Sequence, residues 1–192
     1  GALPGEEVKV RLQKQQRHFS QGQLLSIDKA SEHRVEPSCP HFSRCGACQL
    51  QHLVTAEQLP YKQENLHQQL TRQLKLSEIP WQAPIASEGF GYRRRARLGV
   101  RYRKQLDEII IGFREEANKH LTAIDACPVL EPKLSALITP MQACISELNA
   151  KTVITQMELI ASDQGPIVVL RHLKPLQADD QNRLKVFAKQ HE

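Results

Sequence analysis

Short segments of alternating hydrophobic and polar residues run through the chain and predict β-strands. The first two, residues 6–12 and 22–28, are separated by a polar turn and are typical of an antiparallel pair. Because two strands alone do not form a stable sheet in water, we expect them to be the last strands of a barrel whose earlier strands are missing. Residues 33–40, a polar segment with two prolines, then form a linker.

Two pairs of alternating segments lie further along the chain. Residues 92–103 and 108–114 predict one β-hairpin, and residues 152–162 and 166–172 predict a second hairpin with a glycine in its turn. A short strand is also expected just before Cys127. The β elements of the main domain are therefore expected to be antiparallel.

A helix is expected over residues 56–76, where hydrophobic residues recur at helical spacing. Leu66, Leu70 and Leu74 fall roughly on one face, and Thr55 is a candidate N-cap. An exposed leucine stripe of this kind needs a partner surface.

Two further helices are expected. One covers residues 131–149 and is bent or interrupted at Pro140, and the other covers residues 178–190, with Asp179 or Asp180 near its N-terminus. Together with the hairpins they predict an α+β fold. No run of about 18 apolar residues is present, so no contact with a membrane is expected.

The positive charge of the chain is concentrated in one segment. The 192 residues include 26 lysines and arginines and 21 aspartates and glutamates, a formal net charge of +5. Residues 91–119 alone hold nine basic and four acidic side chains, which accounts for the whole excess. A concentrated basic segment favours an anionic partner more strongly than a high isoelectric point does.

Three of the five cysteines lie within the stretch CPHFSRCGACQLQH. Cys39, Cys45 and Cys48 have the spacing C-x5-C-x2-C, and Gly46 eases the tight turn that brings two sulfurs toward one point. The first residues do not resemble a secretory signal, so we expect a cytoplasmic protein in a reducing compartment. There, clustered cysteines more often bind metal than form disulfides, and an odd number of cysteines fits a disulfide framework poorly.

A tetrahedral metal site or a cubane cluster needs a fourth ligand. Cys127 lies in the loop segment DACPVL, whereas Cys144 lies in a helical stretch among hydrophobic residues. We therefore expect Cys127 to be the fourth ligand and Cys144 to be a core residue. His41 and His52 are possible zinc ligands, although hydrogen bonding to the loop is the commoner role for such histidines.

The identity of the metal stays open at this point. Four thiolates suit zinc and an iron–sulfur cluster equally well. Zinc ribbons usually contain two CxxC pairs and this chain has one, while the x5 spacing departs from the ferredoxin pattern. The alternatives are a zinc-binding nucleic-acid-binding module with the same four cysteines and a small electron-transfer protein, which the basic segment disfavours.

The segment GYRRRARLGVRYRK places most of its arginines on one face of a strand, because residues two apart point the same way. This face contains Arg93, Arg95, Arg97, Arg101 and Arg103. The opposite face contains Tyr92, Ala96, Leu98, Val100 and Tyr102 and is interrupted by Arg94. Guanidinium groups suit bidentate contacts with phosphate, and Tyr92 or Phe90 could stack on a base, which predicts an RNA-binding strand.

The alternative is a solvated strand whose arginines pair with acidic residues nearby. The candidates for such pairs are Asp107, Glu108, Glu115 and Glu116. Four acids cannot neutralise nine bases, which favours binding of an external anion.

Three motifs in this order, CPHFSRCGACQLQH, GYRRRARL and DACPVL, resemble the RumA (RlmD) type of bacterial 23S ribosomal RNA (uracil-5-)-methyltransferases. The resemblance extends over essentially the whole chain. It implies an S-adenosylmethionine-dependent enzyme with a TRAM domain (an OB-like barrel), a central domain with a [4Fe–4S] cluster, and a C-terminal methyltransferase domain. It also implies that Cys39, Cys45, Cys48 and Cys127 ligate the cluster and that the arginine strand lies near 23S ribosomal RNA.

The resemblance assigns residues 1–36 to the end of the TRAM barrel and residues 37–192 to the central iron–sulfur and RNA-binding domain. In this family an enzyme cysteine attacks C6 of uracil, C5 takes the methyl group, and a carboxylate removes the C5 proton. The sequence contains no matching cysteine and no glycine-rich cofactor loop. We therefore expect a catalytically inactive fragment without S-adenosylmethionine-binding residues, whose leucine stripe contacts the missing methyltransferase domain.

Overall fold

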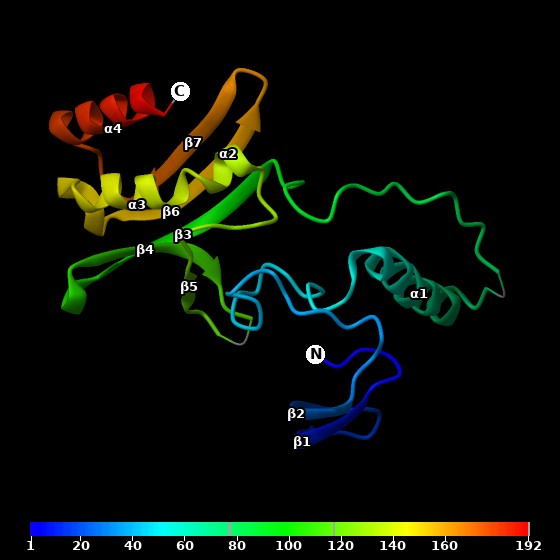
Figure 1. Ribbon diagram of the computed structural model, residues 1–192. Helices are drawn as coiled ribbons and strands as arrows, with labels where there is room; N and C mark the ends of the chain where they lie inside the picture. The colour runs from blue at the N-terminus through cyan, green and yellow to red at the C-terminus, as the bar shows by residue number, and fades with distance from the viewer. Residues whose placement is uncertain (77, 117, 192) are drawn as a thin grey trace. The chain divides into compact units, whose positions relative to one another are not determined.

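The computed structural model describes residues 1–76, 78–116 and 118–191, which form two compact units (Figure 1). The first unit contains Gly1–Pro37 and Gln49–Ala86, and the second contains Ser38–Cys48 and Ser87–Glu192. The segment with the three neighbouring cysteines therefore packs with the second unit, although both of its flanks in the sequence pack with the first. These units describe packing, and the assignment of the beginning of the chain to a TRAM barrel stays a prediction.

An antiparallel pair of strands begins the first unit. β1 (Glu7–Gln15) pairs with β2 (Ser20–Lys29), with Val10 opposite Leu24, as the alternating pattern predicted. Hydrophobic side chains such as Val10 and Leu12 stay exposed on this ribbon. A two-stranded sheet that buries so little apolar surface gains little stability from its own packing.

A buried ion pair ties the start of the first unit to the segment after β2. The Arg34 guanidinium donates to both carboxylate oxygens of Glu6, from Nε at 2.5 Å and from Nη2 at 2.8 Å. The backbone N–H groups of Leu3 and Ser31 donate to the same carboxylate, whose side chain has no exposed surface. The hydrogen bond from Arg34 is the main reason that the pKa of Glu6 falls from an ordinary 4.5 to about 2, against the opposing effect of burial.

The helix expected after the cysteine segment is α1 (Thr55–Leu74). Its N-cap is Val54, so Thr55 is the first helical residue and the prediction that it caps the helix is wrong. Leu66 and Leu74 are 45% and 58% exposed, and no residue of α1 is buried. None of the described helices is long and apolar enough to cross a bilayer.

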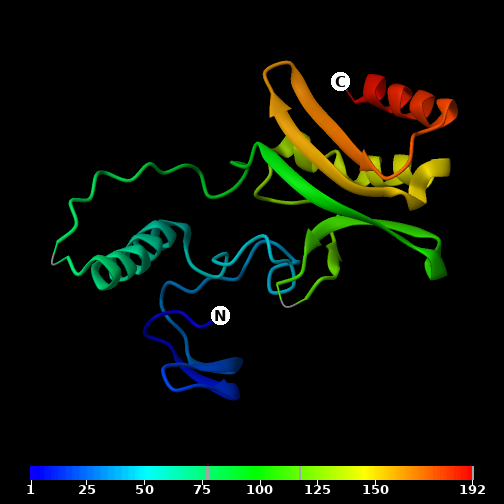
Figure 2. The same cartoon turned by 180° about the vertical axis from the view of Figure 1, so that it is seen from behind.

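The second unit is built on a five-stranded antiparallel sheet in the order β5-β4-β3-β6-β7 (Figure 2). Its strands are β3 (Arg95–Arg103), β4 (Glu108–Arg114), β5 (Leu121–Ala123), β6 (Ile154–Ser162) and β7 (Gly165–His172). The pairs β3–β4 and β6–β7 are the two predicted hairpins, and pairing of β3 with β6 joins them. The short strand predicted before Cys127 is β5.

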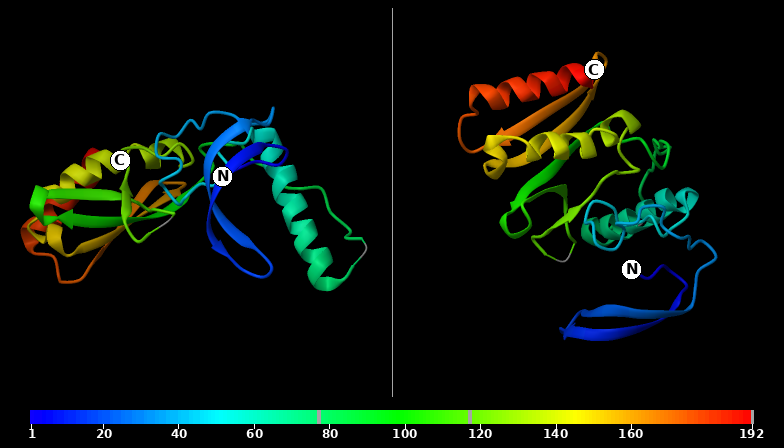
Figure 3. Two further views of the ribbon diagram at one scale, coloured as in Figure 1. Left: turned by 90° about the horizontal axis from the view of Figure 1, so that it is seen from below. Right: turned by 60° about the vertical axis from the view of Figure 1, so that its left-hand side comes forward.

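Helices pack on one face of this sheet (Figure 3). They are α2 (Pro132–Ser135), α3 (Ile138–Ser146) and α4 (Ala178–Gln190), and the short 3-10 helices η1 (Lys104–Leu106) and η2 (Asn149–Thr152) lie in the connections. The core between helices and sheet includes Leu98, Ile111, Ile138, Ile145, Met157 and Leu159. The predicted α+β fold is thus confirmed, and among the described residues of the second unit no helix covers the opposite face of the sheet.

The helix predicted over residues 131–149 is interrupted one turn before its proline. α2 ends at Ser135 and α3 begins at Ile138. A proline ring clashes with the carbonyl group four residues earlier, which for Pro140 is that of Ala136. The helix therefore breaks at Ala136, and Pro140 sits in the first turn of α3, where its missing N–H costs nothing.

A buried carboxylate connects α4 to the end of the core helices. Asp180 is fully buried and accepts hydrogen bonds from the backbone N–H groups of Asn149 at 2.8 Å and Ala150 at 3.0 Å. The residue lies in the first turn of α4, as predicted, but its carboxylate satisfies the backbone of η2.

The Glu6–Arg34 pair makes the stability of the first unit depend on pH. Because the pKa of Glu6 is lower in the folded chain, its contribution is complete above about pH 4.5 and is lost as the pH falls toward about 2. Urea unfolding of the first unit between neutral and acidic pH is expected to show this loss. Glu6→Gln should be less stable at neutral pH and should lack this part of the pH dependence.

Glu7→Gln is the matched control, since the exposed Glu7 carboxylate lies 3.8 Å from Lys29 in an exposed pair. If the free energy of unfolding of wild type and of Glu6→Gln changed in parallel with pH, the assignment of this pH dependence to Glu6 would be contradicted.

Candidate metal centre and nucleic-acid interface

The cysteine loop, residues 38–48, is attached to the end of β4 by its backbone. The N–H of Gly46 donates to the carbonyl oxygen of Arg114 at 2.9 Å, and Cys45 forms an antiparallel bridge with Glu115. The loop therefore continues the hydrogen bonding of the sheet beyond β4. This contact places the cysteine loop beside the strand that carries part of the basic segment.

Gly46 is needed because two backbones approach closely. A Cβ atom at this position would lie 3.0 Å from the carbonyl oxygen of Arg114 and 3.2 Å from the backbone of Glu116. The φ angle of Gly46 lies outside the left-handed region. Gly46 was expected to ease a tight turn. In the structure, the close contact with the end of β4 is what requires a glycine at this position.

The structure brings Cys127 to the same neighbourhood as the three cysteines of the loop. Burial is the main cause that raises the pKa of the Cys45 thiol, and electrostatic interaction with Cys48, Cys127 and Cys39 raises it further. Burial likewise raises the pKa of the Cys127 thiol, and electrostatic interaction with Cys48 and Cys39 raises it further. Interactions of this kind fall off with distance, so the four thiols lie near one another.

Nearby backbone N–H groups favour the thiolate form of two of these cysteines. The N–H of Ala47 lowers the pKa of the Cys45 thiol, and the N–H groups of Val129 and Leu130 lower that of Cys127, in each case against the larger effect of burial. Hydrogen bonds of this type stabilise a thiolate, which is the form that binds metal.

The sulfurs are not drawn together into a coordination geometry. Among the described residues, no group of three or more His, Cys, Asp or Glu side chains is arranged to hold a metal ion. All five cysteines are present as thiols. The donor types and their proximity fit a thiolate-bound metal, and the ligand assignment of Cys39, Cys45, Cys48 and Cys127 stays a prediction.

The remaining cysteine and the two histidines have other surroundings. Cys144 packs against the hydrophobic core from α3, as expected, and burial raises the pKa of its thiol. His41 Nε2 lies 3.5 Å from the carboxylate of Asp125. His52 is a buried residue of the first unit, and burial is the main cause that lowers its pKa.

The predicted alternation of β3 is present from Arg95 onward. Ala96, Leu98 and Val100 are buried under the helices. The exposed residues on the opposite side are Arg95, Arg97, Arg101 and Arg103. Arg93 and Tyr92 precede the strand, which begins three residues later than predicted, and the backbone of Arg93 instead bridges in parallel to Leu130.

Part of the charge on this face is neutralised by carboxylates. Arg95 Nε donates to Glu158 at 2.8 Å, and Arg97 approaches the same carboxylate at 3.7 Å. The hydrogen bond from Arg95 is the main reason that the pKa of Glu158 is lowered. Arg103 pairs with Glu108, one of the acids that the sequence nominated.

Two other nominated acids have different partners. Asp107 accepts from Lys151 at 2.8 Å and from the Tyr102 hydroxyl at 2.9 Å. Glu115 accepts from Arg44 of the cysteine loop at 2.9 Å. These two carboxylates therefore stabilise turns and do not neutralise the arginines of β3.

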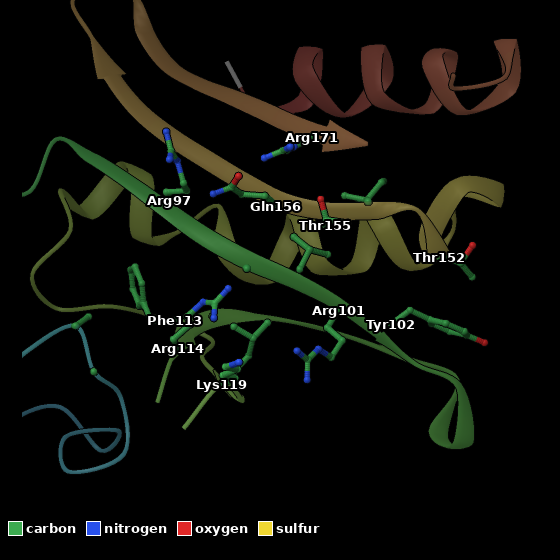
Figure 4. Close-up of a pocket in the computed structure, with 17 residues that line it drawn as sticks. Arg97, Arg101, Tyr102, Phe113, Arg114, Lys119, Thr152, Thr155, Gln156 and Arg171 are labelled. Carbon is green, nitrogen blue, oxygen red and sulfur yellow. The ribbon is translucent and has the colours of Figure 1, made fainter. Parts of the chain in front are cut away.

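An open hollow of about 920 Å³ on the helix-free face gathers basic side chains (Figure 4). The basic residues that line it are Arg97, Arg101, Arg114, Lys119 and Arg171. Its described lining contains no aspartate or glutamate, and Gly46 and Ala47 of the cysteine loop form part of its wall. The two sites predicted from separate motifs therefore adjoin within the second unit.

Three of these basic residues, Arg114, Lys119 and Arg171, were not predicted from the sequence. Arg114 is two residues beyond Gly112 on β4 and so shares its face, which the alternation of that strand already indicates. Arg171 lies on β7, opposite Gln156 of β6, and only the order of the strands reveals that it faces the same hollow. Of the predicted residues, Arg93, Arg95, Arg103 and Tyr92 lie outside the lining.

The chain is similar over its whole length to bacterial proteins of known name. A protein from Edwardsiella ictaluri (strain 93-146) is 41% identical over 190 residues, which is 99% of this chain and 43% of that protein. Relatives from Photorhabdus laumondii and Vibrio cholerae serotype O1 are 38% and 40% identical and match the full chain. All three are named 23S rRNA (uracil(1939)-C(5))-methyltransferase RlmD.

Over its full length, the chain is similar to part of the RlmD proteins. This confirms the resemblance that the three motifs indicated. The chain spans about 43% of the length of these RlmD relatives. No protein-family model matches it.

Substituting Gly46 tests the attachment of the cysteine loop. Gly46→Ala would force the loop away from β4, because the added methyl group meets backbone atoms that cannot rotate aside. We expect a loss of about 1–3 kcal/mol in the free energy of unfolding, measured by urea denaturation. Ser43→Gly is the matched control in the same loop, since Ser43 has a φ of 74° and glycine adopts this angle without strain. Equal stability of Gly46→Ala and wild type would contradict the close contact.

Proposed function

We propose that this chain is the metal-binding and RNA-binding part of an S-adenosylmethionine-dependent enzyme that forms 5-methyluridine in 23S ribosomal RNA. The observation that carries the proposal is the similarity to RlmD proteins, which extends over 99% of the chain at 41% identity. The relatives' name states both the substrate and the atom that receives the methyl group. The basic face of the second unit supports an RNA substrate independently of the name.

We assign the methyl transfer itself to a part of the enzyme outside this chain. The reaction needs a nucleophilic thiolate for C6 of uracil. Four of the cysteines lie together in the candidate metal centre, and burial raises the pKa of the fifth, Cys144, which makes its thiol a poor nucleophile. The role of this chain is therefore to hold the RNA, and the exposed leucines of α1 are proposed to contact the remaining part of the enzyme.

We propose that Cys39, Cys45, Cys48 and Cys127 bind a [4Fe–4S] cluster. Their proximity and the lowering of the pKa values of Cys45 and Cys127 by nearby backbone N–H groups support the proposal. A bound cluster would supply four metal–thiolate bonds that cross-link the cysteine loop to the segment after β5. The second candidate is zinc bound by the same thiolates, since the donor set suits either metal.

The metal assignment predicts different outcomes for two cysteine substitutions. Cys127→Ser should lose most of the iron and sulfide that the wild-type chain binds after anaerobic reconstitution, about four of each per chain, together with the visible absorbance. Cys144→Ser is the control and should keep them. Full iron content in Cys127→Ser would contradict the assignment, and a colourless wild-type protein with about one zinc would favour the second candidate.

The function is tested with a hybrid enzyme. When this chain replaces the matching region of the Edwardsiella ictaluri relative, the hybrid is expected to transfer label from S-adenosylmethionine to 23S ribosomal RNA. The chain alone should bind RNA and transfer no label. A folded hybrid that leaves the RNA unmodified would contradict the proposed function. Turnover by the chain alone would contradict the assignment of methyl transfer to another part of the enzyme.

A further inference from the structure

We infer that the RNA backbone is bound by the basic side chains of the hollow that lack a carboxylate partner, namely Arg101, Arg114, Arg171 and Lys119. Arg95 and Arg103 instead serve mainly to join neighbouring strands. The inference rests on the proposed RNA-binding function and names the residues and the kind of contact. Of these four, only Arg101 was nominated from the sequence.

The distribution of ion pairs separates two classes of arginine on one face. The guanidinium groups of Arg95 and Arg103 are hydrogen-bonded to Glu158 and Glu108 on the adjacent strands. A phosphate that binds there must compete with a carboxylate already in place. Arg97 is intermediate, because it lines the hollow but lies 3.7 Å from Glu158.

The other four cations of the hollow have no such competitor within the described part of the chain. Among the described residues, none of them lies within 4.0 Å of a carboxylate oxygen. They come from β3, β4, the connection between β4 and β5, and β7, and Figure 4 shows their side chains around one hollow. Positive charges gathered without counter-charges repel one another, and a bound polyanion relieves this repulsion.

Two glycines that lie opposite each other on β3 and β4, Gly99 and Gly112, line the hollow. A Cβ atom on Gly99 would lie 2.7 Å from Leu121 Cδ2, and one on Gly112 would overlap the carbonyl oxygen of Thr122 at 1.8 Å. Larger residues would therefore displace β5 and the Leu121 side chain. The glycines thus allow β5 and the Leu121 side chain to pack closely against β3 and β4 beside the cations.

We expect the hollow to bind phosphate groups without recognising individual bases. Its two aromatic residues are both engaged in the protein. The Tyr102 hydroxyl donates to Asp107, with Lys151 Nζ 5.3 Å above its ring, and Phe113 packs against the core. Neither presents a ring for stacking, so we expect contacts to phosphate groups, which carry no sequence information.

Salt dependence of RNA binding tests this inference. A short fluorescein-labelled single-stranded RNA is titrated with the chain between about 50 and 200 mM salt, and log Kd is plotted against log salt concentration. Arg101→Gln, Arg114→Gln and Arg171→Gln should each reduce the slope by about 0.7, the value for one lost contact to single-stranded RNA. Homopolymeric RNAs of different base should bind the wild type with similar affinity and should all show the same loss.

Matched controls remove the same charge elsewhere. Arg95→Gln and Arg103→Gln remove paired arginines of the same face, and Arg183→Gln removes an exposed arginine of α4 on the helical side of the sheet. All three should keep the wild-type slope. Circular dichroism verifies that every variant is folded.

The outcomes distinguish this inference from the function on which it rests. Equal reductions of slope in the hollow variants and in Arg95→Gln or Arg103→Gln would overturn the inference while RNA binding itself stands. Unchanged slopes in all three hollow variants would overturn it as well. Absence of RNA binding by the wild type at the lowest salt would overturn the RNA-binding function itself.

Discussion

Backbone hydrogen bonding between the cysteine loop and the end of β4 is the interaction on which both candidate sites depend. The loop has no regular secondary structure over residues 38–48, so its conformation has to be imposed by what it contacts. The Gly46 N–H and the Arg114 carbonyl provide that contact at 2.9 Å, and Gly46 is the residue type that permits it. The same hydrogen bond orients three of the thiols and borders the hollow, which explains why the two sites adjoin.

The second constraint is that one face of the sheet is buried and the other is not. Helices α2, α3 and α4 cover the side on which Leu98 and Met157 lie, so the arginines of β3 are directed to the other side. Charge accumulates there because arginines of three strands share it. Glu158 and Glu108 neutralise part of this charge by pairing with the arginines nearest them, Arg95 and Arg103. The hollow itself therefore stays strongly positive.

Local patterns in the sequence were sufficient for the hairpins, for α1 and for the buried face of β3, because these depend on residues close together in the chain. The start of β3 and the cap of α1 were missed, since the backbone of Arg93 and Val54 is determined by contacts with other segments. The proximity of Cys127 to the loop followed from its context beside a strand. The effect of nearby backbone N–H groups on the pKa of its thiol could not be predicted, because it depends on the exact turn after β5.

The composition of the hollow was beyond sequence reasoning for a different reason. Glu158 neutralises Arg95 and Arg97 only because β6 pairs with β3, and Glu158 lies 63 residues beyond Arg95 in the sequence. Arg171 reaches the same face through one further pairing, of β7 with β6. Strand order is a property of the whole sheet, so counting charges along one strand identified a basic face without identifying which of its arginines remain available.

The position of the thiols relative to β4 and β5 has a consequence for the hollow. The cysteine loop is fixed to the end of β4, and Cys127 follows β5, so the four thiols belong to segments attached to the two strands that flank the connection carrying Lys119. Bonds from a metal to these thiolates would hold these two strands together. Arg101 and Arg171 lie within strands and are held by the ladder of the sheet whether or not a metal is bound. Loss of the metal would therefore act on the Lys119 side of the hollow and leave the arginines of β3 and β7 in place.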